Sequence, residues 1–376
     1  MNSCYRRNPA PPPSSCAECG ILSECGGWDD ERRHRGCFQR CEGCFDTECD
    51  YTCLANPILF GRSVEEVGGL GKVSTRLASI DSGAATLPWY LPQIDHGSQR
   101  SRVLKEQVVS IPLYRLCRFN RYGRLELLHQ SRSALLNAFK LSERTAVLVT
   151  SVCKDRWIEG LYESRRLLLP LLKELGLFAM TAPNFSFVRD TPRSNSIWNQ
   201  TKMFRVMEDM TDAGIAVLPH LQAQTKKDWT RLQEVYAEFP GVRHACMEFQ
   251  TGLNREDPNF PAREVYKGHF MDFQQATGGR VHPIVLAGYR EIGFLGETCQ
   301  SYSMVDACAF VKTVNYQEAR IDFDGKLRWR QAGLEMQNNM AALLEQNISK
   351  QREYLLRKNG LGIDGRSLTP SLLPAA

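Results

Sequence analysis

The chain has 376 residues, of which 43% are hydrophobic and 24% are charged, and its formal net charge is +5. This length suits one small and one large domain, and the composition is that of an ordinary globular protein. No apolar run approaches the ~20 residues that cross a bilayer as a helix, so we expect no membrane-spanning helix. The first residues lack the apolar core of a secretory signal, so we expect a cytoplasmic protein.

The cysteines are concentrated near the N-terminus, where nine of the 14 lie within the first 53 residues. Eight of them are separated by intervals that let neighbouring sulfurs converge on one ion. These candidate metal ligands are Cys16, Cys19, Cys25, Cys37, Cys41, Cys44, Cys49 and Cys53. Eight thiolates can complete two four-thiolate sites. The sequence therefore predicts a cysteine-rich metal-binding module over residues 1–60, with two zinc ions as the first expectation.

Other chemistry of the same thiols remains open. An iron–sulfur cluster is ligated by the same side chains. The spacing of Cys37, Cys41 and Cys44 matches the three-cysteine loop of radical S-adenosylmethionine enzymes, although the polar stretch before Cys37 is unlike the buried strand that precedes that loop. Disulfides are less expected, because a protein without a secretion signal is surrounded by reductants.

Residues 61–140 are expected to link this module to a larger domain, and they contain a basic segment with interleaved aromatic residues. The stretch Asn120-Arg-Tyr-Gly123 favours a turn, so the segment around it is expected to form a hairpin. Arginine contacts phosphate, and aromatic rings stack on bases. The predicted nucleic-acid contacts are Arg115, Arg118, Arg121, Arg124 and Tyr122. The alternative is a solvated hairpin whose rings pack on the large domain.

Residues 141–330 alternate between short apolar runs and amphipathic stretches. Strands are expected over 145–151, 177–183, 214–219, 242–249 and 281–287, with a sixth over 304–311. Helices are expected over 156–175, 195–213, 226–239 and 261–276. This order is typical of parallel βα repeats, and strands without polar alternation are buried on both faces. The predicted fold is an α/β barrel or partial barrel, with an open doubly wound sheet as second choice. Residues 331–376 are expected to add a helix over 334–357 and a tail.

Polar residues follow the ends of the predicted strands, where parallel α/β domains carry their chemistry. The candidate catalytic residues are Glu248, His220, Asn184 and Asp306. Glu248 suits general acid or base catalysis, and His220 suits proton transfer. Further strand-end candidates are Lys154, Asp155, Ser186, Gln222, Gln250, Tyr289 and Arg290.

Three strand-end segments carry a family resemblance: Ala182-Pro-Asn-Phe-Ser-Phe, Gly214-Ile-Ala-Val-Leu-Pro-His and His282-Pro-Ile-Val-Leu-Ala-Gly. They resemble tRNA-guanine transglycosylase-like barrels and their uncharacterised relatives in phage, plasmid and defence loci, over about residues 140–330. The resemblance implies base exchange on nucleic acid, which that family performs with an aspartate nucleophile, and a zinc site beyond the barrel. This chain departs from the family because its cysteines are N-terminal and no matching aspartate motif is present.

The sequence thus favours a metal-stabilised α/β-barrel protein that acts on nucleic acid by base-modifying or glycosidic-bond chemistry, in a phage-defence or mobile-element setting. One alternative is a non-catalytic subunit of a larger assembly that binds nucleic acid or a protein partner. A further alternative is a radical S-adenosylmethionine enzyme or another iron–sulfur enzyme.

Overall fold

The parallel strands form two sheets. The computed structural model describes residues 16–27, 49, 51–54, 56–71, 77, 87–187, 191–249 and 262–362. One sheet has the order β2 (Val108–Pro112), β5 (Ala146–Thr150), β6 (Ala179–Thr181), β7 (Val217–Leu218). The other has the order β1 (Tyr90–Pro92), β10 (Ser303–Asp306), β9 (His282–Leu286), β8 (His244–Glu248). All neighbours within these two sheets pair in parallel, which confirms the predicted α/β class.

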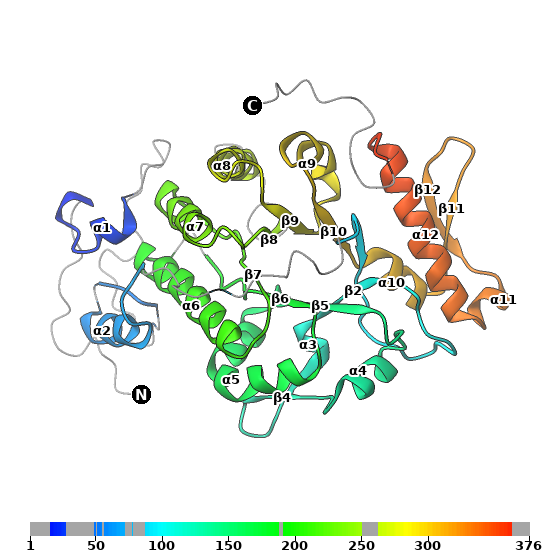
Figure 1. The fold of residues 1–376 in the computed structure, drawn as a ribbon, viewed down its shortest axis with the longest axis horizontal. Coiled ribbons are helices and arrows are strands. Elements are labelled where there is room, and N and C mark those ends of the chain that lie inside the picture. The colour runs from blue at the N-terminus through cyan, green and yellow to red at the C-terminus, as the bar shows by residue number, and fades with distance from the viewer. Residues whose placement is uncertain are drawn as a thin grey trace.

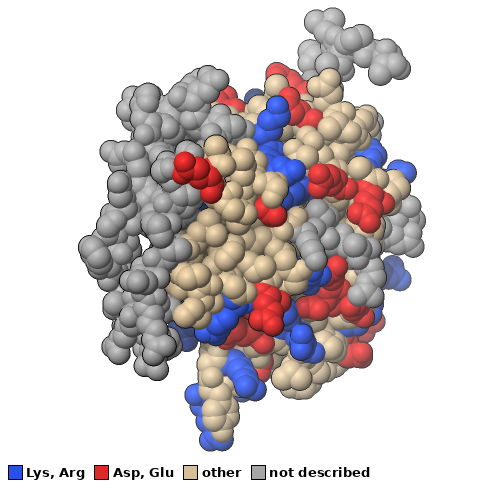
Figure 2. All heavy atoms as spheres, turned by 90° about the vertical axis from the view of Figure 1, so that its left-hand side faces the viewer, with Lys and Arg blue, Asp and Glu red and all other residues tan. Residues whose placement is uncertain are grey.

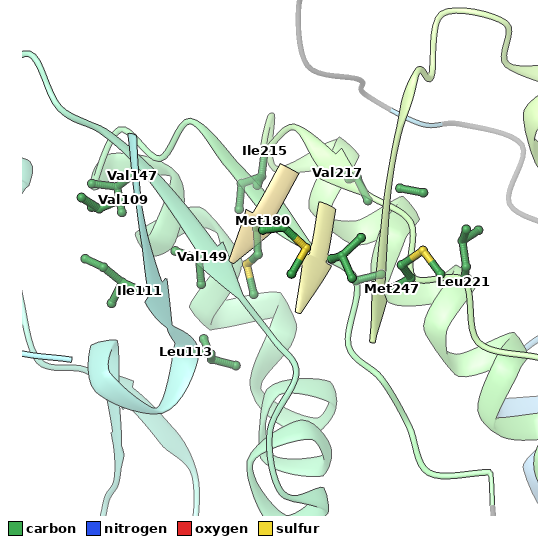
Figure 3. Close-up of a cluster of buried hydrophobic side chains, with 14 of the residues drawn as sticks. Val109, Ile111, Leu113, Val147, Val149, Met180, Ile215, Val217, Leu221 and Met247 are labelled. Atoms are coloured by element: carbon green, nitrogen blue, oxygen red, sulfur yellow. The ribbon is translucent and has the colours of Figure 1, made fainter. Parts of the chain in front are cut away.

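Two isolated parallel bridges link the edges of the two sheets. Gln93, directly after β1, pairs with Ser110 of β2. His220, two residues after β7, pairs with Cys246 of β8. One apolar cluster takes a side chain from every one of the eight strands: Leu91, Val108, Leu148, Ala179, Leu218, Cys246, Ile284 and Val305. Since side chains alternate along a strand, the intervening residues face the opposite way. Figure 3 shows several of these, which belong to a separate and larger cluster: Val109, Val147, Val149, Met180, Val217 and Met247.

Helices follow the strands along the chain and surround them (Figure 1). They are α5 (Asp155–Glu174), α6 (Arg193–Asp212), α7 (Lys226–Glu238), α8 (Ala262–Ala276), α9 (Ile292–Thr298) and α10 (Cys308–Val314), with a 3-10 turn, η3 (Tyr289–Glu291), before α9. Buried apolar residues of α5, Ile158, Leu161, Leu168 and Leu172, are spaced by three, seven and four residues, so they share the helix face that covers the sheet. The predicted alternation is confirmed. The stretch 304–311 differs, because the strand ends at Asp306 and a helix begins at Cys308.

The parallel sheets begin before residue 141, because β1 and β2 lie within the segment expected to be a linker. After β2 the chain forms α3 (Leu113–Leu116) and then an antiparallel hairpin of β3 (Cys117–Phe119) and β4 (Leu125–Leu127), followed by α4 (Arg132–Ala138). This hairpin is the one predicted around Asn120. Its turn includes Gly123 at φ +75°, a left-handed conformation that glycine adopts without strain.

The described N-terminal residues form a 3-10 turn (Cys16–Glu18), α1 (Leu22–Cys25) and α2 (Pro57–Glu66). Helix α2 crosses residue 60, where the sequence suggested a domain boundary. A small apolar cluster joins Ile21, Val67 and Leu70 to Ile197 of α6. The described part of this region therefore packs directly on a helix of the large domain.

The C-terminal residues add a second antiparallel hairpin, β11 (Gln317–Ile321) and β12 (Leu327–Gln331), which the sequence did not predict. The helix expected over 334–357 is two helices, α11 (Leu334–Gln337) and α12 (Met340–Lys358). They are separate because the Asn339 side chain accepts the Ala342 N–H at 3.2 Å and starts a new helix. Among the described helices, none has the length and apolarity that crossing a membrane requires.

Candidate functional site at the carboxyl ends of the strands

Two of the predicted catalytic residues lie in direct contact. Asn184 follows β6 and Glu248 is the last residue of β8, and the Asn184 Nδ2 donates a hydrogen bond to Glu248 Oε1 at 2.9 Å. Asn184 is 5% exposed and Glu248 is 8% exposed. The Cys153 backbone N–H donates to Asn184 Oδ1 at 3.3 Å. Because each end of the carboxamide has its own partner, the orientation of Asn184 toward Glu248 is fixed.

His220 lies two residues after β7, beside β8, and is enclosed. Its backbone pairs with Cys246, two residues before Glu248, and its ring is 2% exposed. Within the structure described, neither ring nitrogen of His220 has a hydrogen-bond partner. Burial lowers the pKa of His220 to about 3, so the ring is neutral at physiological pH. A neutral ring can donate and accept hydrogen bonds, and the lowered pKa makes His220 a weaker base than a histidine in water.

Asp306 faces away from this group. Val305 belongs to the cluster shared by all eight strands, so the next side chain points to the opposite face. There the Tyr90 hydroxyl donates to Asp306, and the Cys308 N–H donates to Asp306 Oδ1 at 2.6 Å. Burial raises the pKa of Asp306 to about 6. These contacts tie β10 to β1 and to the start of α10, so the structure does not bring Asp306 together with Asn184 and Glu248.

The other predicted strand-end residues are distributed around the same edge. Ser186 donates to Asp155 Oδ1 at 2.6 Å, which ties the loop after β6 to the start of α5. Lys154 is exposed, and Tyr289 and Arg290 lie in the 3-10 turn η3 before α9. The backbone oxygen of Gln222 accepts from Gln200 at 3.4 Å. Gln250 lies outside the described residues.

The structure adds polar groups that we did not predict from the sequence. Thr181 accepts the Ser151 N–H at 2.7 Å between β5 and β6. Gln93, directly after β1, donates to Asp95 at 3.1 Å. Thr181 lies in the strand predicted over 177–183, so its position near a strand end could have marked it as a site residue. Gln93 could not be found in this way, because the sequence does not predict strand β1.

The predicted nucleic-acid contacts fall into two groups. Arg115 pairs with Asp95 at 3.0 Å, and Arg118 pairs with Glu126 at 2.7 Å across the hairpin. Arg121 lies over the Tyr122 ring, 4.7 Å from its centre, and Tyr122 is 71% exposed. Arg124 is exposed as well. The hairpin extends at the lower edge of Figure 1, and Figure 2 shows basic side chains on the projection at its own lower edge. Its tip is therefore aromatic and basic.

The predicted metal ligands are only partly described. Cys16, Cys19, Cys25, Cys49 and Cys53 lie within the described residues, whereas Cys37, Cys41 and Cys44 lie outside them. In the part of the chain that is described, no three His, Cys, Asp or Glu side chains are grouped as metal ligands. The described cysteines thus do not make a complete site by themselves.

Three histidines with a lowered pKa, one buried and two partly buried, lead us to expect a loss of stability in mild acid. Burial lowers the pKa of His220 and His282 to about 3 and that of His244 to about 4. The unfolded chain, with a histidine pKa of about 6.5, therefore binds protons first, and stability falls as pH drops below 6.5. Between pH 7 and 5.5 we expect a loss of about 1 kcal/mol for each histidine, measured by urea unfolding.

Protonation of Asp306 stabilises the folded state as pH falls below 6, because its pKa is raised on folding. This single group offsets only part of the loss from the three histidines. The variant His220→Gln removes one titrating group. Its free energy of unfolding should depend less steeply on pH, because unfolding of the variant takes up about one proton fewer. A pH dependence identical to that of the unmodified protein would contradict the assignment of a buried, neutral His220.

No family model and no curated protein sequence matches this chain. Among solved structures, the putative copper homeostasis protein CutC from Streptococcus agalactiae is similar, with 9% sequence identity and a TM-score of 0.29. That match covers 58% of this chain and 98% of the CutC chain.

Proposed function

We propose that this protein is an enzyme that acts on nucleic acid, with its site at the carboxyl ends of the parallel strands. The observation that carries this proposal is the hydrogen-bonded pair of Asn184 and Glu248, buried between the ends of β6 and β8. A buried carboxylate is costly unless it has partners, and enzymes place such groups where protons are transferred. Glu248 is the proposed general acid or base, and Asn184 holds it in position.

Base-modifying or glycosidic-bond chemistry suits a single oriented carboxylate. Breaking a bond between a base and its sugar requires a proton for the departing base, and a carboxylic acid can supply it. The carboxylate that remains can then take a proton from an attacking water or incoming base. Neutral His220, two residues after the adjacent strand β7, contributes hydrogen bonding rather than charge. The exposed basic tip of the β3–β4 hairpin supports a polyanionic substrate.

We also propose that the eight strands close into a barrel. Support comes from the two bridges that join the sheet edges and from the apolar cluster with one residue of each strand. In a closed parallel barrel of this size, inward side chains fill the interior in layers. Glu248 is two residues beyond Cys246 of that cluster, and His220 is two residues beyond Leu218. Both side chains would then point toward the barrel axis at its carboxyl end.

The direct test is base release or base exchange. The full-length protein is incubated with defined single-stranded and structured RNA and DNA, with and without free bases. Released bases and modified nucleosides are then quantified by mass spectrometry. We expect a product with one class of nucleic acid. Salt-sensitive binding without any product would instead favour a non-catalytic binding subunit.

The hairpin tip is expected to contribute to nucleic-acid affinity. Replacing Arg121 and Arg124 together with alanine should weaken binding of a single-stranded oligonucleotide. It should also reduce the slope of log K against log salt by about 1.4, since each phosphate contact contributes about 0.7. Tyr122→Ala should weaken binding by about 1–3 kcal/mol and leave the slope unchanged, because stacking releases no counterions.

Fluorescence anisotropy over a salt series measures both effects. Lys350→Ala is a matched control, because Lys350 is exposed on α12 and pairs with Glu353 of the same helix. If the double arginine variant behaved like the Lys350 control, the hairpin would not be the nucleic-acid contact.

We further propose that the N-terminal cysteines bind zinc, on the strength of their eight-thiol spacing. No catalytic step depends on this metal. Elemental analysis of protein purified without oxygen should find about two zinc ions per chain and no visible absorption band. Iron together with a broad absorption band near ~400 nm would instead indicate an iron–sulfur cluster.

A further inference from the structure

One side of helix α6 is hydrogen bonded to the N-terminal segment 51–71. The Thr52 N–H donates to Asn195 Oδ1 at 3.1 Å, and Ser194 Oγ donates to the Thr52 carbonyl at 2.5 Å. Farther along the helix, the Gly71 N–H donates to Thr201 Oγ1 at 3.0 Å, and Arg205 Nε donates to the Val67 carbonyl at 2.7 Å. Both ends of segment 51–71 are therefore hydrogen bonded to α6.

The loop that carries Asn184 also contacts α6, through Asn199 and Lys202, which lie one and two turns after Asn195 on the same face of the helix. Asn199 Nδ2 donates to the Ser186 carbonyl at 2.8 Å. The Lys202 Nζ lies 4.4 Å from the centre of the Phe185 ring. These contacts fix the two residues that follow Asn184, and Asn184 in turn contacts Glu248. Helix α6 thus contacts both segment 51–71 and the loop of the candidate site.

We propose that segment 51–71 is a brace that positions Asn184 and Glu248 through α6, with Asn195 as the central positioning residue. This inference rests on the proposed function only in taking Asn184 and Glu248 as the site. The segment includes Cys53, which is buried and directly follows Thr52. The state of the cysteine region is therefore linked to the geometry of the site.

The composition of α6 explains why the brace is needed. Its first three turns are largely polar yet buried, including Ser194, Asn195, Asn199, Gln200 and Thr201. Buried polar groups must keep their hydrogen bonds, and the partners of this helix come from segments far away in the sequence. When the hydrogen bonds to Thr52 are lost, Ser194 and Asn195 in the N-terminal turn of α6 lose their partner in segment 51–71. The loop 182–187, which depends on the same helix, then opens more often.

The experiment is hydrogen exchange with mass spectrometry on the full chain. Asn195→Ala removes the acceptor for Thr52, whereas Asn195→Asp keeps an oxygen in the same place. Thr230→Ala is the control, because its hydroxyl donates within α7, to the Lys226 carbonyl at 3.0 Å, and not to segment 51–71 or the Asn184 loop among the described residues. We expect Asn195→Ala to accelerate exchange about fivefold to tenfold in peptides covering both 51–54 and 182–187. Asn195→Asp and Thr230→Ala should exchange as the unmodified protein does.

Thr201→Val gives an independent second variant, since it removes the acceptor for Gly71 at the other end of the segment. It should accelerate exchange in 68–71 and in 182–187. Faster exchange in the N-terminal peptides with no change in 182–187 would overturn the brace. That outcome would leave the proposed function standing if base release still depended on Glu248. Coupled exchange in a protein without any reaction on nucleic acid would support the brace and remove the proposed function.

Discussion

Replacing Asp228 with alanine is expected to lower the free energy of unfolding by about 3–5 kcal/mol. Asp228 is 0% exposed and pairs with two buried guanidinium groups, those of Arg193 and Arg231. Its other oxygen accepts the N–H groups of Gln224 at 2.9 Å and Thr225 at 3.1 Å, which caps α7. Without the carboxylate, two cations stay buried together and the capping box of α7 loses the half that Asp228 supplies, so several penalties coincide.

Urea unfolding followed by circular dichroism measures this loss. The control is Asp209→Ala, which also breaks an aspartate–arginine pair, Asp209 with Arg165 at 2.6 Å. That pair is partly exposed to solvent, so its loss should cost no more than about 1 kcal/mol. If both variants lost the same small amount, the buried cluster would not be what holds α7 against α6.

The alternating part of the fold was predictable because its signals are local. The strands β5 to β9 are short β-branched or apolar runs. In the amphipathic helices between them, apolar residues recur every three to four positions. Glycines with positive φ, such as Gly176 and Gly214, lie directly after α5 and α6. Each of these features lies within a window of about 20 residues, so no long-range information was needed.

Other elements could not be predicted because their stability comes from distant partners. Strand β1 has three residues and forms only by pairing with β10, more than 200 residues later. The β11–β12 hairpin presents Arg320, Arg328 and Arg330 on one side, so its apolar content is low. From its polar residues, the first part of α6 would be expected to face solvent, yet segment 51–71 packs against it.

The candidate site shows the same division. Strand-end position alone identified Asn184 and Glu248, which the structure joins by a hydrogen bond. It also selected Asp306, which points to the opposite face. In strands buried on both sides, the sequence does not reveal which alternate residues face which way. Only the packing of neighbours such as Val305 decides this.

Replacing Glu248 with glutamine is expected to reduce turnover on nucleic acid about 10²-fold to 10⁴-fold, the range for loss of a general acid or base. Glutamine has nearly the same shape, and its carbonyl oxygen can still accept the hydrogen bond from Asn184. The fold should therefore be kept while proton transfer is lost. Asn184→Ala should cost less, roughly 10-fold to 100-fold, because it leaves the carboxylate present but poorly oriented.

Initial rates of base release, with thermal unfolding of each variant alongside, separate these effects. Glu238→Gln is the matched control, since Glu238 is exposed on α7 and should have no influence on rate. Oligonucleotide affinity should stay the same in all three variants, because the arginines of the hairpin are untouched. A Glu248→Gln protein that kept half of its turnover would remove Glu248 from the mechanism. The acid–base group would then have to be sought elsewhere along the carboxyl ends of the strands.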